Sequence, residues 1–220
     1  PYQFDLNMTD YPLVMNDEME FIGSVALHAE GGGKRRDQIK GKIDLTSATY
    51  TLPKDISTEL KDIFDIEEEQ PEQHFSSQTE MNVELNLLNP LLIKGWGVDS
   101  TWRGSLIVGG SLGVPTLSGK VSLRQGEFKL LGPIFKLTRG EITFVPSEQI
   151  NPLLDIRAET EKDEVKAIIS VTGDTNSPKL SLNSQPELPQ EEILSKILFS
   201  ESTANLSPYQ AVKIATIAGS

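Results

Sequence analysis

Three ten-residue stretches of this chain place apolar residues at the same positions. Residues 43–52, 121–130 and 135–144 each carry apolar residues at positions 1, 3, 8 and 10, with glycine or alanine at position 6. Apolar and polar residues alternate with the period of a β-strand, but the odd step from position 3 to position 8 would flip later side chains to the other face. The pattern predicts a turn or bulge at position 6, with Gly126 or Gly140 left-handed in a short hairpin loop or bulge.

The same one-sided alternation continues outside these stretches. Residues 4–8, 83–87 and 165–171 alternate in the same way, although Ile168 interrupts the polar side of the last segment. Glycine and proline clusters separate the segments, and no rhythm of strand, helix and strand is visible. We therefore expect an all-β fold, a long curled sheet that is antiparallel or solenoid-like and has one apolar face.

The composition favours a single sheet with an apolar concave face. Only 37% of the residues are hydrophobic and 6% aromatic, which is lean for a sandwich with a thick closed core. A plain β-sandwich, in which two apolar faces pack on each other, remains the structural alternative.

Two segments depart from the strand pattern. Within a sheet domain of residues 1–188, we expect residues 53–80 to be an exposed acidic insertion with a short amphipathic helix. Residues 189–220 should be helical, because Pro189 and Pro208 suit helix starts. The first helix carries an apolar stripe that should bury itself in the sheet or at its mouth: Ile193, Leu194, Ile197 and Leu198. The second start signal is followed by apolar residues that include Val212, Ala215 and Ile217.

Charge and residue usage argue against several functions. The net charge is −12, from 20 basic and 32 acidic residues, so the chain has no basic stripe for nucleic acid or for anionic headgroups. The sequence has no cysteine, and neither His28 nor His74 belongs to a spaced ligand set. No nucleotide-binding or nucleophile motif is present, so we expect a non-enzyme without metal or cofactor. No segment approaches a membrane span, and a chain that opens at Pro1 is predicted to be a piece of something longer.

From about Gly104 to Phe199 the chain resembles the C-terminal domain family of TamB. The resemblance rests on an ordered set of short segments rather than on any one of them: residues 115–123, 126–128, 135–137, 140–144, 151–156, 171–173, 184–189 and 192–199, with Gly132 and Pro178. Ser200 departs from the family, which often has glycine there. The resemblance implies a sheet curled into a trough (a β-taco), in a periplasm-spanning protein that is anchored in the inner membrane of a diderm bacterium.

Two functions follow from the resemblance. In the first, the apolar groove conducts phospholipid acyl chains between the inner and outer membranes, and burying each Leu- or Phe-sized side chain against lipid contributes about 1.5–3 kcal/mol. The alternative is a scaffold for outer-membrane β-barrel assembly, which binds a partner of the TamA or BamA type by strand addition. The predicted lipid-binding residues are Ile43, Leu45, Tyr50, Leu52, Val83, Leu85, Val121, Leu123, Phe128, Leu130, Phe135, Leu137, Ile142 and Phe144.

Overall fold

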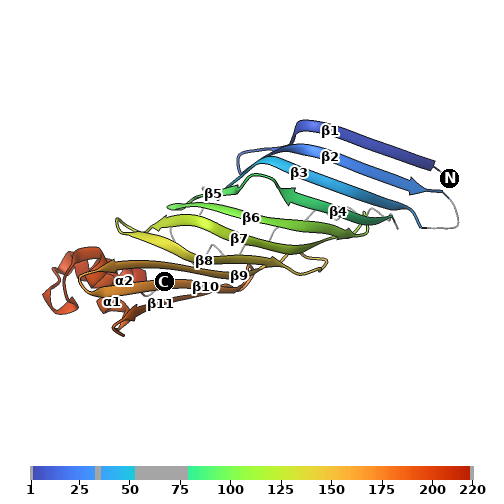
Figure 1. Cartoon of the computed structure of the whole chain (residues 1–220). Coiled ribbons are helices and arrows are strands. Elements are labelled where there is room, and N and C mark those ends of the chain that lie inside the picture. The colour runs from blue at the N-terminus through green and yellow to red at the C-terminus, as the bar shows by residue number, and fades with distance from the viewer. Residues whose placement is uncertain (1, 33–35, 53–78, 219–220) are drawn as a thin grey trace.

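Eleven strands form one sheet in the computed structural model of the chain, which describes residues 2–32, 36–52 and 79–218. The strands follow one another from β1 at one end to β11 at the other, where two short helices lie (Figure 1). This confirms the all-β sheet with short C-terminal helices. The elements are β1 (Tyr2–Met15), β2 (Met19–Gly31), β3 (Gln38–Thr51), β4 (Glu80–Leu87), β5 (Leu91–Gly95), β6 (Val98–Gly110), β7 (Pro115–Lys129), β8 (Ile134–Phe144), β9 (Leu153–Lys162), β10 (Val165–Asp174), β11 (Lys179–Gln185), α1 (Gln190–Phe199), a 3-10 turn η1 (Thr203–Asn205) and α2 (Pro208–Ala218).

One position in the sheet is filled by two short strands. Both β4 and β5 pair in parallel with β3 and antiparallel with β6, while the other neighbouring strands pair antiparallel. Between β4 and β5, the Leu88 N–H donates to the Leu45 carbonyl and Asn89 Nδ2 donates to the Thr46 carbonyl at 2.8 Å. The expected acidic insertion lies outside the described residues up to 78, and Glu80 is already the first residue of β4.

At least nine of the ten residues of each matching stretch lie in one long strand, so the hairpin interpretation is wrong. Instead, the register of β3 with β2, of β7 with β6 and of β8 with β9 skips one residue, at Thr46, Arg124 and Thr138 respectively. Each extra residue occupies position 4 of its stretch. A one-residue bulge restores the phase, because positions 1, 3, 6, 8 and 10 then share one face. Neither Gly126 nor Gly140 has a positive φ, contrary to the prediction.

These irregularities form a line across the sheet, which we call the crease. The crease comprises the register shift of β1 between Met8 and Tyr11, the bulges at Thr46, Arg124 and Thr138, and the break at residues 88–90. Bulges bend strands and increase their twist, so an aligned row of them curls a sheet about one face.

Burial follows the crease. Leu45, Trp102 and Val121 lie beside it and are 3–4% exposed, whereas Phe4 and Leu180, on the two edge strands, are 60% and 68% exposed. A sheet that curls around its apolar face gives this gradient, because side chains nearest the bend are the most enclosed.

Position 6 is small because the inside of the crease has little room. A Cβ atom on Gly140 would lie 2.6 Å from the Trp102 ring and 2.7 Å from Leu123 Cβ, and one on Gly126 would lie 2.5 Å from Ser100 Cβ. The alanine at this position in the first stretch, Ala48, is 3% exposed. Close packing therefore selects the small residue here, rather than an unusual backbone angle.

The C-terminal helices begin where proline predicts them. Pro189 precedes α1 as its N-cap, and α1 buries Ile193, Leu194 and Ile197, as expected of its apolar stripe, while Leu198 is half-buried. The helix α2 begins at Pro208, as expected. Its buried residue is Ile214, whereas Val212 and Ala215 are exposed, and the side chain of Ile217 lies outside the described residues.

Ser200 ends α1 in a conformation that favours glycine. Its φ is 59°, and its N–H donates to the Lys196 carbonyl. A left-handed residue with a Cβ costs about 1 kcal/mol, and the hydrogen bond uses only backbone atoms. We expect Ser200→Gly to raise the free energy of unfolding by about 1 kcal/mol in urea titrations, with Ser200→Ala as the control that keeps the strain. Equal stability of the two variants would contradict this account.

Glu192 ties the segment after α1 to the first turn of the helix. Its Oε2 accepts hydrogen bonds from Thr203 Oγ1 at 2.6 Å and from the Thr203 N–H at 2.9 Å. These bonds hold the pKa of the Glu192 carboxyl below its ordinary range. Their stabilisation is therefore complete above the ordinary glutamate pKa of about 4.3 and disappears as the pH falls through the lowered value.

This linkage predicts an acid-sensitive helical end. In thermal unfolding followed by circular dichroism between pH 3 and 6, Glu192→Gln should lose stability less steeply towards acid pH than the wild type does. The matched control is Glu191→Gln, at the exposed neighbouring position in the same turn. Parallel pH profiles for Glu192→Gln and the wild type would refute the prediction.

Candidate functional site

One face of the sheet is apolar from β1 to β11. Residues paired directly across two strands share a face, so the register defines rows of side chains that cross the sheet. One row consists of Met8, Val25, Ile43, Leu85, Leu106, Gly119 and Phe144. A second row consists of Gly104, Val121, Ile142, Leu154 and Gly173. We call this surface the apolar face.

The residues predicted from the sequence as lining gather on or beside this face. They come from β3, β4, β7 and β8, and Leu52 and Leu130 directly follow the last residues of β3 and β7. Phe128 pairs with Phe135, and Val121 pairs with Ile142, so the two adjacent stretches share a face as expected. The Phe128 and Phe135 rings lie 6.3 Å apart between centroids.

Polar side chains on the apolar face are few, and the most deeply buried one, Ser100, is hydrogen-bonded. Ser100 is 2% exposed, donates to the Ile93 carbonyl at 3.3 Å and accepts from Trp102 Nε1 at 2.9 Å. Within the described strands, the register places one charged residue on this face, Lys162 at the end of β9. Lys162 pairs with Val165, which is 4% exposed.

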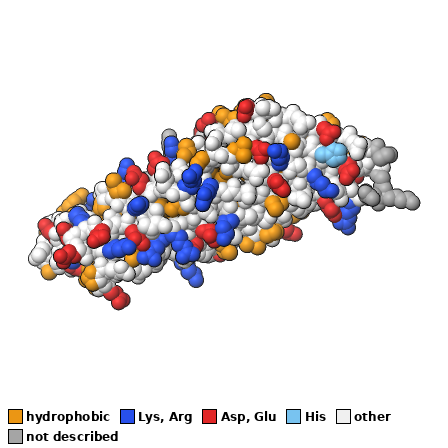
Figure 2. All heavy atoms as spheres, in the orientation of Figure 1, with side chains coloured by type: hydrophobic (Ala, Val, Ile, Leu, Met, Phe, Trp, Pro, Cys, Tyr) orange, Lys and Arg blue, Asp and Glu red, His pale blue; other side chains and the backbone are white. Residues whose placement is uncertain are grey.

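The opposite face carries ion pairs. Ion pairs join Lys42 to Asp44, Lys120 to Glu141 and Lys166 to Glu159 at 2.5–2.8 Å. In each pair the hydrogen bond from lysine lowers the pKa of the carboxyl below its ordinary range. Figure 2 shows blue and red side chains interspersed over the sheet. The sheet therefore has one charged face and one face of apolar side chains.

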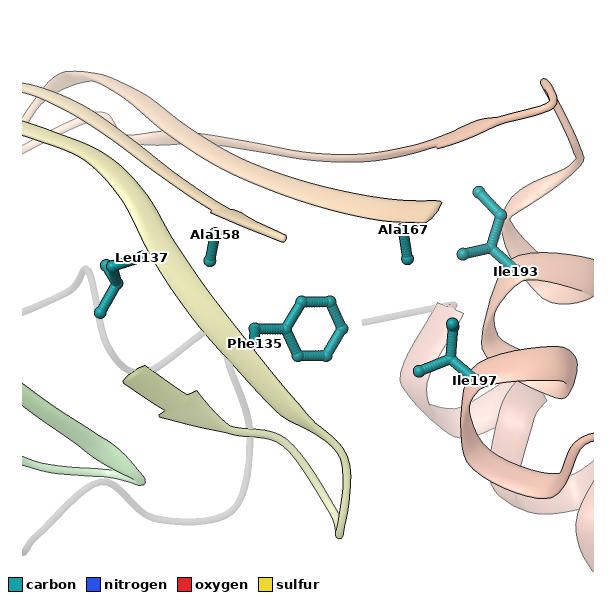
Figure 3. Close-up of a cluster of buried hydrophobic side chains, with 6 residues drawn as sticks. All are labelled: Phe135, Leu137, Ala158, Ala167, Ile193 and Ile197. Carbon is teal, nitrogen blue, oxygen red and sulfur yellow. The ribbon is translucent and has the colours of Figure 1, made fainter. Parts of the chain in front are cut away.

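Part of the apolar face is covered by α1. Ile193 and Ile197 project from α1 towards Phe135 and Ala167, and all four are at most 2% exposed (Figure 3). The helix-covered cluster comprises Phe135, Leu137, Ala158, Ala167, Ile193 and Ile197. Among the predicted lining residues, Leu123, Phe128 and Leu130 pack against this cluster. At these three residues the apolar face packs against other side chains of the chain, so it is not open to a ligand.

The rest of the predicted lining lies outside the helix-covered cluster. Leu45, Val83 and Val121 are buried, at 4–5% exposed, whereas other positions are partly exposed. The partly exposed set consists of Ile43, Tyr50, Leu52, Leu85, Ile142 and Phe144. These six residues form the accessible portion of the predicted site.

Sequence reasoning missed Trp102 and Lys162. Trp102 is 3% exposed, and its ring reaches Gly140 two strands away. Alternation of Val98, Ser100 and Trp102 along β6 would have placed it on the apolar face. Lys162 gives no such signal, because a lysine at a strand end usually faces solvent.

The described residues offer no metal centre: no three His, Cys, Asp or Glu side chains lie close enough together to hold an ion. His28 Nδ1 lies 2.7 Å from Asp5 Oδ1 at the exposed β1–β2 surface, and His74 is outside the described residues. None of the helices in the described part of the chain has the length and apolar content needed to cross a membrane.

Comparison with known proteins agrees with the geometry. The model of the TamB C-terminal domain family matches residues 1–220. The chain is also 27% identical over 146 residues to the translocation and assembly module subunit TamB of Haemophilus influenzae. That match covers 61% of this chain and 11% of the relative, so the chain spans a small part of the relative's length. With a family match over its whole length, the chain belongs to the TamB C-terminal domain family.

Proposed function

We propose that this chain is the C-terminal portion of a TamB-like, periplasm-spanning protein whose apolar face carries phospholipid acyl chains between the inner and outer membranes. The observation that supports this most strongly is the continuity of the face. The two rows of apolar side chains and glycine together cross nine of the eleven strands, and Lys162 is the one charge among the described face positions. Such a surface binds hydrocarbon without recognising any polar group.

The energetics favour sliding over tight capture. Each fully buried Leu- or Phe-sized side chain contributes about 1.5–3 kcal/mol, and a partly exposed one contributes less. Similar neighbours along a row, such as Ile43, Leu85 and Leu106, would offer an acyl chain nearly equal contacts at successive positions. The phosphate headgroup would stay in water, as the charged outer face of the sheet does.

The same proposal assigns no chemical step to the chain. Movement of a lipid along the face needs no catalyst, metal or cofactor, and the membrane anchor would belong to another part of the protein. The periplasm of a diderm bacterium is the compartment in which such a path would connect two membranes.

Site-specific photocrosslinking tests lipid conduction. A benzoylphenylalanine at Leu85 or Phe144 should become linked to phospholipid in cells, because both positions lie on the accessible part of the face. The matched controls are Glu84 and Thr143, adjacent positions whose side chains point to the outer face. Absence of lipid adducts, or equal adducts at inner and outer positions, would reject the proposal.

A second candidate function is an assembly scaffold for outer-membrane β-barrel proteins, acting with a partner of the TamA or BamA type. The observation that favours it is that β1 and β11 each have one strand neighbour. An open strand edge supports strand addition by another chain. Crosslinkers on the free edge of β1 or β11 should then capture such a partner, whereas lipid conduction alone predicts adducts only on the apolar face.

A further inference from the structure

The helix α1 supplies two kinds of contact to the apolar face. Its apolar stripe packs on Phe135 and Ala167 (Figure 3), and its backbone meets Lys162, whose Nζ donates to the Ile197 carbonyl at 3.0 Å. Ile197 lies in the last turn of α1, where carbonyl groups lack helical partners and carry partial negative charge. Lys162, the one cation that the register places on this face in the described strands, therefore binds an oxygen at the end of an apolar segment.

This combination matches the chemistry of a phospholipid. Hydrocarbon covers hydrocarbon along the stripe, and at one end an electron-rich oxygen accepts a hydrogen bond from an ammonium group. A phosphate oxygen would suit Lys162 better than a carbonyl does, because a phosphate carries a full negative charge and a carbonyl oxygen only a partial one, so its Coulomb attraction to the ammonium group is stronger.

The helix also depends on the sheet for its own stability. It has 10 residues, and helices shorter than about 12–15 residues are marginal in water without packing partners. Its buried apolar residues are Ile193, Leu194 and Ile197, and of these Ile193 and Ile197 belong to the helix-covered cluster on the sheet. A ligand that competes for the same surface would therefore release α1 rather than distort the sheet.

We propose that the helix-covered cluster together with Lys162 is a phospholipid site at the C-terminal end of the apolar face, and that α1 occupies it in the absence of lipid. In this site the acyl chains replace Ile193 and Ile197, and a phosphate oxygen replaces the Ile197 carbonyl on Lys162 Nζ. The inference rests on the proposed lipid function and adds to it a headgroup contact and a displaceable cover.

Hydrogen exchange of α1 in the full chain tests the displacement. Dioctanoyl phosphatidylglycerol should remove the protection of residues 190–199, and dioctanoylglycerol, which has the same acyl chains but no phosphate, should need about tenfold higher concentration. Inorganic phosphate alone should leave the protection unchanged. Protection that persists at saturating phosphatidylglycerol overturns the inference.

Lys162→Met separates the headgroup contact from a structural role. The variant keeps an unbranched apolar side chain, and loosening of α1 would shift both lipids alike, so the informative readout is the ratio of the two lipid concentrations. We expect this ratio to fall from about ten to about one. Lys166→Met is the matched control, because Lys166 points to the outer face and pairs with Glu159. A ratio that is unchanged in Lys162→Met also overturns the inference.

The outcomes distinguish this inference from the broader proposal. If lipid crosslinks to Leu85 and Phe144 while α1 stays protected, acyl-chain conduction stands and the C-terminal site is wrong. If lipid neither crosslinks to the accessible face nor releases α1, both proposals fail.

Discussion

Leu137→Asp should unfold the C-terminal half of the sheet, whereas Phe144→Asp should leave the chain folded and abolish lipid labelling. Leu137 is 8% exposed inside the helix-covered cluster, so a carboxylate there has no partner and little water. A buried, unpaired charge costs about 3–5 kcal/mol. Phe144 lies at the end of β8 and is partly exposed, so the aspartate of Phe144→Asp can reach solvent. We expect this substitution to cost about 1–2 kcal/mol of stability.

Urea unfolding and photocrosslinking from Leu85 measure the two effects separately. Leu137→Asn and Phe144→Leu are the controls, because the first removes the charge and the second keeps an apolar surface. A Leu137→Asp chain that unfolds at the wild-type urea concentration would mean that α1 does not seal the cluster. Undiminished lipid adducts in Phe144→Asp would show that lipid does not follow this row.

The strands and their shared face could be predicted because alternation is a local signal. The alternation of apolar and polar residues along one strand predicts which of its side chains share a face, whichever strand lies next to it. The odd step in the three stretches also correctly signalled an irregularity. The position of the irregularity could not be predicted, because a bulge at Thr46, Arg124 or Thr138 and a turn at the glycine or alanine two residues later produce the same shift of phase.

Features that depend on residues far apart in the chain could not be predicted from the sequence. The parallel pairing of β3 with β4 depends on the path of the connection, which periodicity does not encode. The stripe on α1 predicted its burial but not the surface that it covers, so Phe135 and Leu137 were predicted as open lining. Lys162 was missed for the same reason, since its role depends on where the end of α1 lies.

Glycine at position 6 illustrates this limit most sharply. The sequence suggested a need for positive φ, but the structure shows ordinary backbone and a lack of space. The two accounts predict different behaviour of an alanine variant. If a positive φ were the constraint, Gly140→Ala would lose the stability that backbone strain alone removes. If crowding is the constraint, the loss of stability depends on Trp102 and Leu123.

We expect Gly140→Ala to lower the free energy of unfolding by about 3 kcal/mol, because its Cβ would lie 2.6 Å from the Trp102 ring and 2.7 Å from the Leu123 Cβ. Gly109→Ala is the matched control: its Cβ would meet nothing closer than Thr116 Oγ1 at 3.3 Å, so it should change stability by less than about 1 kcal/mol. Replacing the Trp102 ring with a smaller side chain, in the double variant Gly140→Ala with Trp102→Leu, should recover part of the stability that Gly140→Ala loses. Simple addition of the two single-variant losses would show that Gly140 and Trp102 do not compete for space, and the packed crease would then need another explanation.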